Sequence, residues 1–313
     1  MSESAFKIVG VDLAAAPENT AYCVICVEGG NACVHKPESG ATDEKLLEVF
    51  SERGVARIGF DAPFGWPHPF VSALRSHARH NVWPRDRRRK DRHFADLTLR
   101  ATDVHVEESV DNVTPLSVSA SWIAVVAMRA ALLLSRAPES LEVDRSGVNG
   151  NFVEVYPAAA LAAWFNKGGA DWSTGYKGEA PSHREKRHDI VRKLVGATKP
   201  GLALGDATDP LDSGSVDIRD KTKDRRETVA RLIQSDDALD ALISALVTLM
   251  AEVDRRTGHP KHDPLIESVP PARQALAEIE GWIALPTDGS LERLPCRLES
   301  LASDGDTGPE GRR

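Results

Sequence analysis

The run FKIVGVDL, Phe6–Leu13, predicts a buried strand at the start of the domain, because it is mostly apolar and rich in β-branched residues. A short turn leads to a second such run, AYCVICVE at Ala21–Glu28. The tight-turn sequence Gly29–Asn31 then precedes a third, ACVHK. We therefore expect the chain to begin with a three-stranded antiparallel meander.

A helix and a fourth buried strand follow the meander. In TDEKLLEVFSERG, Thr42 is suited to cap the helix, and Asp43 and Glu44 place negative charge in the first turn, where the helix dipole favours it. The next run, VARIGFDAP at Val55–Pro63, is typical of a buried strand that ends at Asp61. This order of elements indicates an α/β fold with a mixed sheet flanked by helices.

The rest of the chain is predicted to complete one domain over residues 1–290. Residues 64–110 are irregular, and residues 196–226 are rich in Gly, Asp, Pro and Ser, so we interpret both as insertions. The polar composition at the end of the chain predicts a disordered tail over residues 291–313. The other predicted elements are a helix at Ser117–Ala137 that buries Trp122, a helix from about Pro157 and a late strand at Glu280–Pro286.

The composition limits the classes of function. A net charge of −8 excludes nucleic-acid binding through overall charge and leaves only local basic patches. Cys23 and Cys26 lie three apart in a predicted strand and thus on opposite faces, and no second pair follows at zinc spacing. We interpret them as reduced core thiols of a cytoplasmic protein. We expect no secretion signal and no membrane span, since no apolar run is long enough.

Four carboxylates stand where a site is expected. Asp12 and Asp61 end buried strands, and the strand ends of α/β sheets are where sites form. Asp237 and Asp240 lie one turn apart on the core-facing side of the predicted helix SDDALDALISALVTLM, Ser235–Met250. Each alone is most simply a turn or cap residue, but Asp240 lies too deep in the helix to cap it. Converging carboxylates need cations, so we predict two Mg²⁺ or Mn²⁺ ions about 4 Å apart that support phosphodiester hydrolysis.

The motifs VGVDLA, IGFDAPFGWP, VEVYPAAAL and DDALDALISAL, followed by EGWIALP, resemble in this order the family called domain of unknown function 429, over about Lys7–Pro286. The resemblance implies a ribonuclease H-like fold, with a five-stranded mixed sheet, and nuclease activity. The last helix also resembles that of RuvC-type resolvases, in which a D-x-x-D-A pattern supplies the final metal ligands. Carried over, Asp12 would bridge both metals, Asp61 would be the fourth-strand ligand, and Asp237 and Asp240 would complete the set.

Three further residues match family positions with open roles. Glu154, in VEVYP, could be another metal ligand or a structural acceptor. Arg100 and Asp103, in LRATD, resemble a family motif of Arg followed by Asp. Arg100 could bind a substrate phosphate bidentately while Asp103 orients it, or the two could form a structural salt bridge near the site.

A basic run, WPRDRRRKDRH, follows the strand that ends at Asp61. It predicts contacts to a phosphate backbone through side chains such as Arg87 and Arg88, and stacking of Trp83 on a base. A solvated charged loop is the alternative.

Three functions are compatible with these features. The first is a metal-dependent nuclease acting on DNA or RNA. The second, an ATPase or phosphotransferase on an actin-like fold, is disfavoured because LAAAPENT, which follows Asp12, has no glycine to hold phosphates. The third, an inactive scaffold, is disfavoured because idle buried carboxylates cost stability. The sequence leaves the oligomeric state open, a homodimer included.

Overall fold

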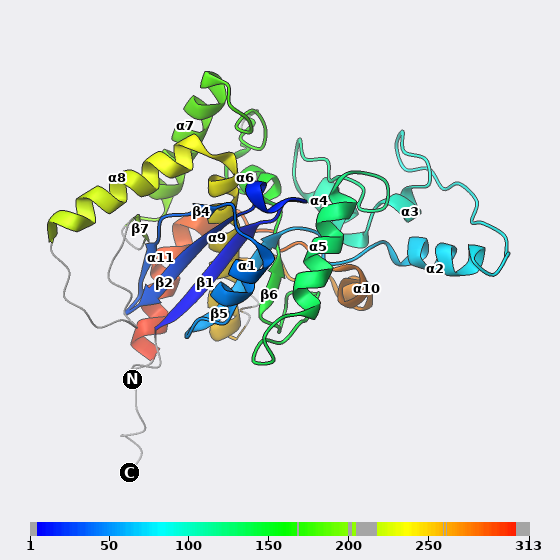
Figure 1. Ribbon diagram of the computed structural model, residues 1–313, viewed down its shortest axis with the longest axis horizontal. Coiled ribbons are helices and arrows are strands. Elements are labelled where there is room, and N and C mark those ends of the chain that lie inside the picture. Colours follow the sequence, from blue (N-terminus) through cyan, green and yellow to red (C-terminus); the bar gives the residue numbers. More distant parts are fainter. Residues whose placement is uncertain are drawn as a thin grey trace, which may run out of the picture.

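A mixed seven-stranded sheet forms the centre of the molecule (Figure 1). The computed structural model describes residues 5–167, 169–199, 202–204, 218–258, 260 and 262–304. The strands are β1 Phe6–Asp12, β2 Ala21–Glu28, β3 Asn31–Val34, β4 Glu38–Ser39, β5 Val55–Asp61, β6 Phe152–Glu154 and β7 Leu202–Leu204. Their order is β6-β5-β1-β2-β3-β7, and β4 pairs with β2 outside this path.

The predicted α/β architecture is confirmed. Strands β1, β2 and β3 form the antiparallel meander, and β5 and β6 continue the sheet in parallel with β1. The sheet exceeds the expected five strands because β4 and β7 extend it. Strand β7 pairs in parallel with β3, so the segment 196–226, predicted as an insertion without regular structure, contributes to the sheet.

Helices cover both faces of the sheet. They are α1 Asp43–Phe50, α2 His68–His77, α3 Ala95–Thr98, α4 Ala101–Ser109, α5 Ile123–Ser135, α6 Pro157–Phe165, α7 Pro181–Ala197, α8 Ile218–Gln234, α9 Asp236–Arg256, α10 Gln274–Glu280 and α11 Ser290–Asp304, with 3-10 turns at Pro17–Asn19 and Pro271–Arg273. Helices α1 and α5 pack on one face, and α9 and α11 lie on the other (Figure 1). The Thr42 side chain caps α1 as predicted, accepting a hydrogen bond from the backbone N–H of Lys45 at 3.2 Å. No described helix is long and apolar enough to cross a membrane.

Helix α9 lies directly against two glycines of the sheet. A Cβ atom on Gly10 of β1 would overlap the backbone of Ala241 and Ala245, and one on Gly59 of β5 would overlap the side chain of Thr248. The absence of side chains at these two positions permits the close approach. The contact fixes the height of α9 over the ends of β1 and β5.

The end of the chain departs from the prediction. Residues 290–304 form α11, in which Leu291, Leu294 and Leu298 are buried against the rest of the core. The predicted disorder is therefore wrong for residues 291–304, because leucines at this spacing form one apolar helix face. Residues 305–313 lie outside the described residues.

Two other predicted elements differ. Helix α5 begins at Ile123, and Trp122 is 91% exposed, so its predicted place in the core is wrong. The helix buries Ala127, Ala130 and Leu133 instead, on a face that excludes Trp122. The segment predicted as a late strand at Glu280–Pro286 makes only isolated bridges within the described residues.

Candidate metal centre

Three carboxylates meet at one end of the sheet. Asp12 and Asp61 are register partners at the ends of the parallel strands β1 and β5, and Asp240 belongs to the second turn of α9. Each offers an oxygen within 4.8 Å of the oxygens of the other two. We call Asp12, Asp61 and Asp240 the acidic group. Within the described ranges, no other set of three His, Cys, Asp or Glu side chains is arranged in this way.

The glycine contacts explain why these side chains converge. Asp12 lies two residues after Gly10, and Asp61 two residues after Gly59, so each carboxylate shares a sheet face with its glycine. That face is the one against which α9 packs. Asp240 therefore arrives beside both carboxylates with the same helix turn that contacts Gly10. The G-x-D pattern at the end of two strands is a signal already present in the sequence.

The electrostatics of the acidic group favour an added positive charge. Burial, followed by the neighbouring Asp240 and Asp61, raises the pKa of Asp12 well above its usual value. Burial raises the pKa of Asp61 to about 7, with Asp240 adding to the effect and a nearby ammonium opposing it. Three carboxylates this close hold either a proton or a cation. Their all-oxygen donor set fits a hard divalent ion such as Mg²⁺ or Mn²⁺.

Two residues that the sequence reasoning missed bind Asp240. Lys177 places its ammonium 2.7 Å from Asp240 Oδ2, and the buried Tyr176 hydroxyl donates to Oδ1 at 2.9 Å. The negative charge of Asp240 is the main cause that raises the pKa of Lys177. Lys177 remains 57% exposed, so its ammonium faces both the acidic group and solvent. Both residues precede α7 in a polar segment, DWSTGYKGE, that has no periodic pattern to mark them.

The start of α9 places Asp237 at the rim of the acidic group. Ser235 caps the helix by accepting from the N–H of Ala238 at 3.1 Å, and Asp236 accepts from the N–H of Gly178 at 2.8 Å. Asp237 is half-buried, and burial raises its pKa, with Asp236 and then Asp240 adding to the effect. Its charge also raises the pKa of Asp12. Asp237 thus contributes to the field of the acidic group without belonging to the three residues whose oxygens converge.

Arg100, Asp103 and Glu154 form a closed ion network beside the acidic group. Arg100 donates to Glu154 at 2.7 and 2.9 Å, to Asp103 at 2.9 and 3.2 Å and to the carbonyl of Glu280 at 3.1 Å. Glu154 also accepts from the N–H of Phe64 at 2.9 Å. All five guanidinium N–H groups therefore have acceptors, in a buried setting. In this structure Arg100 has no donor left for a phosphate, and Glu154 accepts from Arg100 and lies outside the converging oxygens.

The basic run lies on an arm formed by α2, α3 and the chain between them, which extends away from the sheet (Figure 1). Arg87 is highly exposed, and Arg88 pairs with Asp86 at 3.4 Å. The Trp83 ring packs edge-on against His77, with ring centroids 5.6 Å apart. Within the described part of the chain, no contact joins these side chains to the acidic group. Of the predicted substrate-binding residues, Arg100 and Asp103 line a pocket together with Asp61, whereas Trp83, Arg87 and Arg88 lie apart from the acidic group.

A small pocket opens beside Asp61. It has a volume of about 70 Å³, and most of its wall is apolar. Its apolar lining includes Pro115, Leu116, Ile123 and Ile283, and its polar lining includes Arg100, Asp103, Glu154 and Tyr156. One substrate can therefore place a charged part at a cation held by the acidic group and an uncharged part in this pocket.

A mixed α/β domain that gathers carboxylates at parallel strand ends defines the general class of this protein. The family model described as "Protein of unknown function (DUF429)" matches residues 10–265, so the chain belongs to this family. The match spans Asp12, Asp61 and Asp240. No curated protein and no solved structure matches the chain.

Proposed function

We propose that the protein is a divalent-metal-dependent nuclease, which hydrolyses phosphodiester bonds in DNA or RNA. The observation that carries this proposal is the convergence of the Asp12, Asp61 and Asp240 oxygens within 4.8 Å. The ribonuclease H-like fold implied by the sequence resemblance agrees with a meander followed by parallel strands, with ligands at the ends of β1 and β5.

The three carboxylates would hold Mg²⁺ or Mn²⁺, and Asp237 at the rim is our candidate for helping to hold a second ion. When bound, such ions lower the pKa of a bound water and offset the charge on the scissile phosphate. The raised pKa values of Asp12 and Asp61 support this, because a cation removes the repulsion that raises them.

Lys177 and Tyr176 have separate roles in this proposal. The buried Tyr176 hydroxyl fixes the rotation of the Asp240 carboxylate. The exposed ammonium of Lys177 can donate to a phosphate oxygen of a substrate bound over the acidic group, which favours the negative charge that develops there. The apolar pocket beside Asp61 would take a neighbouring part of the nucleotide chain.

The proposal also includes the nucleic-acid contacts and the cellular compartment predicted from the sequence. Exposed Arg87 and Arg88, with Trp83, are candidates for holding a long nucleic acid at a distance from the acidic group. Cys23 and Cys26 are buried and form no disulfide, which supports a reducing compartment such as the cytoplasm. We propose no assembly state, and a homodimer stays a prediction from the sequence.

A cleavage assay tests the proposal. Wild type, Asp12→Asn and the exposed control Asp111→Asn are each offered single-stranded, duplex, branched and RNA–DNA hybrid substrates, with Mg²⁺, with Mn²⁺ or with chelator. We expect cleavage by wild type and Asp111→Asn that needs the ion, and a loss of about 100-fold or more in Asp12→Asn. Equal cleavage by Asp12→Asn would contradict the mechanism. No cleavage by any variant, together with no ion-dependent rise in melting temperature, would indicate a scaffold.

A further inference from the structure

A second cavity, of about 280 Å³, lies at the opposite end of the sheet from the acidic group. It is lined by Arg57 near the start of β5, the loop 146–148, the end of α9 and parts of the segment 264–284. Arg57 precedes Asp61 by four residues on β5, a distance of about 13 Å along the strand. Along α9 the separation is similar, since Glu252 follows Asp240 by twelve residues, or about 18 Å. The cavity is therefore separate from the candidate metal centre.

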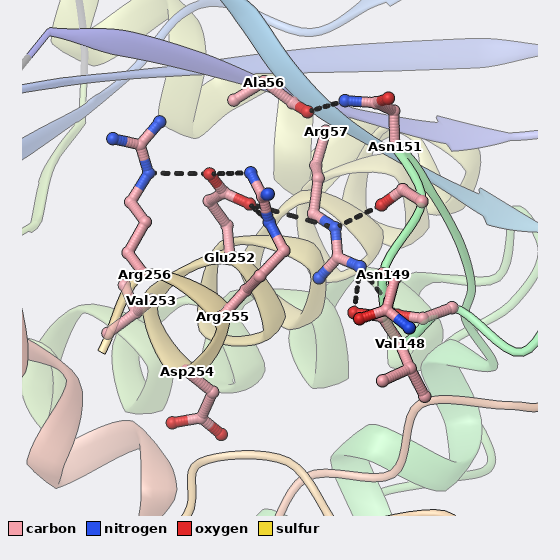
Figure 2. Close-up of polar contacts among 12 residues, drawn as sticks. Ala56, Arg57, Val148, Asn149, Asn151, Glu252, Val253, Asp254, Arg255 and Arg256 are labelled. Carbon is pink, nitrogen blue, oxygen red and sulfur yellow. Dashed lines mark hydrogen bonds and ion pairs between the residues drawn. The ribbon is translucent and has the colours of Figure 1, made fainter. Parts of the chain in front are cut away.

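Arg57 is a buried cation whose guanidinium uses only some of its N–H donors. It is 1% exposed, and its Nε donates to the carbonyl of Gly150 at 3.0 Å. Its Nη2 donates to the carbonyls of Gly147 at 2.7 Å and Val148 at 3.1 Å, which anchors the loop (Figure 2). The remaining terminal nitrogen, Nη1, has no hydrogen-bond partner among the described residues. Because Arg57 lines the cavity, the two N–H groups of Nη1 are available to a ligand there.

The charge of Arg57 is incompletely balanced. The nearest carboxylate, Glu252, is fully buried, but Arg255 and Arg256 already donate to both of its oxygens at 2.6 to 2.8 Å (Figure 2). Arg57 stays 3.9 Å from Glu252. Three guanidinium groups thus share one carboxylate, and a buried cation that is only loosely paired is costly. An anion in the cavity would supply the missing partner.

The two acidic residues that line the cavity are occupied elsewhere. Asp254 accepts from two backbone N–H groups at 2.8 and 2.9 Å and from Arg297 at 3.3 Å. Glu267 pairs with His105 at 2.9 Å. Neither carboxylate is left without a partner of its own, so they do not neutralise the guanidinium of Arg57.

The remaining wall sets the shape and polarity of a ligand. It is largely apolar, with Val148, Ile266, Val269, Trp282 and Ala284 as the main contributors. A singly charged carboxylate can be buried in such surroundings at less cost than a phosphate with almost two charges. An aromatic or aliphatic body would pack against Trp282 and the branched side chains.

We propose that this cavity binds a small organic carboxylate, with its anionic group on Arg57 Nη1 and its apolar body against Trp282. This site is independent of the proposed nuclease activity, since it uses none of the residues of the acidic group.

The proposal is tested by measuring phenylacetate binding to the full chain, with calorimetry and saturation-transfer NMR as the two readouts. Neutral phenylacetamide is the matched control ligand. For a ligand of about ten heavy atoms we expect a Kd of about 1 mM or tighter. Phenylacetamide should bind about tenfold more weakly, because it lacks the charge that pairs with Arg57. Arg57→Gln should weaken phenylacetate binding by a similar factor.

A second variant keeps the test decisive if Arg57→Gln fails to fold. Ala284→Leu fills part of the cavity without touching Arg57, and it should also weaken phenylacetate binding about tenfold. Asp12→Asn, in the acidic group, should leave the Kd unchanged. Equal affinity for phenylacetate and phenylacetamide, no saturable binding of phenylacetate, or unchanged binding by Ala284→Leu would each overturn the proposal.

Discussion

Replacing Asp61 by Asn is expected to stabilise the fold, by an amount that grows with pH. Burial raises the pKa of this carboxyl from its ordinary 3.8 to about 7 in the folded chain. A folded-state pKa above the unfolded value means that the folded chain binds the proton more tightly. The contribution of the Asp61 proton to the unfolding free energy of the wild type is then fully present at low pH, and it is lost as pH rises from about 4 through about 7.

The expected magnitude follows from this shift. About three pKa units correspond to about 4 kcal/mol between the two protonation states. Asp61 is only partly buried and its charge is shared with neighbouring groups, so solvent screening reduces the expected effect to about half. Part of this stabilisation is already lost at about pH 5. The wild type should therefore lose a further amount of about 1 kcal/mol in unfolding free energy between about pH 5 and about pH 8. Asn cannot ionise, and Asp61→Asn escapes this loss.

Urea denaturation in the presence of chelator provides the measurement. The unfolding free energies of wild type, Asp61→Asn and the exposed control Asp91→Asn are compared at about pH 5 and about pH 8. The difference in unfolding free energy between Asp61→Asn and wild type should increase at the higher pH, whereas the difference between the control and wild type should not. Excess Mg²⁺ should then decrease the difference for Asp61→Asn by stabilising the wild type alone. A difference that is constant with pH, or a less stable Asp61→Asn at about pH 8, would show that burial does not raise the pKa of Asp61.

Three further substitutions follow from the contacts described. Arg100→Met should lower the unfolding free energy by about 3 to 5 kcal/mol in urea titrations, because Glu154 loses its buried partner; a loss below about 1 kcal/mol would contradict this. Lys177→Met should lower the melting temperature in chelator and tighten Mn²⁺ binding in calorimetry, since Asp240 loses its ammonium partner; weaker Mn²⁺ binding would count against that role. Gly10→Ala should cost about 2 kcal/mol or more by displacing α9, and a near-neutral result would show that the helix can shift freely.

The sequence predicts the framework of the acidic group because its signals are local. Apolar runs mark β1 and β5 and show where each ends, which identifies Asp12 and Asp61. The depth of Asp240 within an apolar helix excludes a capping role, and the structure places it with the other two. These inferences need only periodicity and chain order.

The remaining features depend on contacts between distant segments. Lys177 reaches Asp240 because the segment before α7 packs over α9, and nothing in its own sequence marks that contact. Both roles considered for Glu154 suit a carboxylate on a strand, and its contact with Arg100 depends on a segment more than fifty residues away in the chain. The last helix escaped prediction because the polar composition of the segment hides an apolar face, and its leucines become recognisable as core only where they pack against the rest of the fold.

The packing of α9 on Gly10 and Gly59 has a consequence for protein synthesis. Asp12 and Asp61 leave the ribosome long before residue 240 is made, and a domain folds as a unit. The three carboxylates meet only when α9 packs against β1 and β5. A nascent or prematurely terminated chain therefore carries two of the three carboxylates, and the acidic group is completed only after most of the domain has been synthesised.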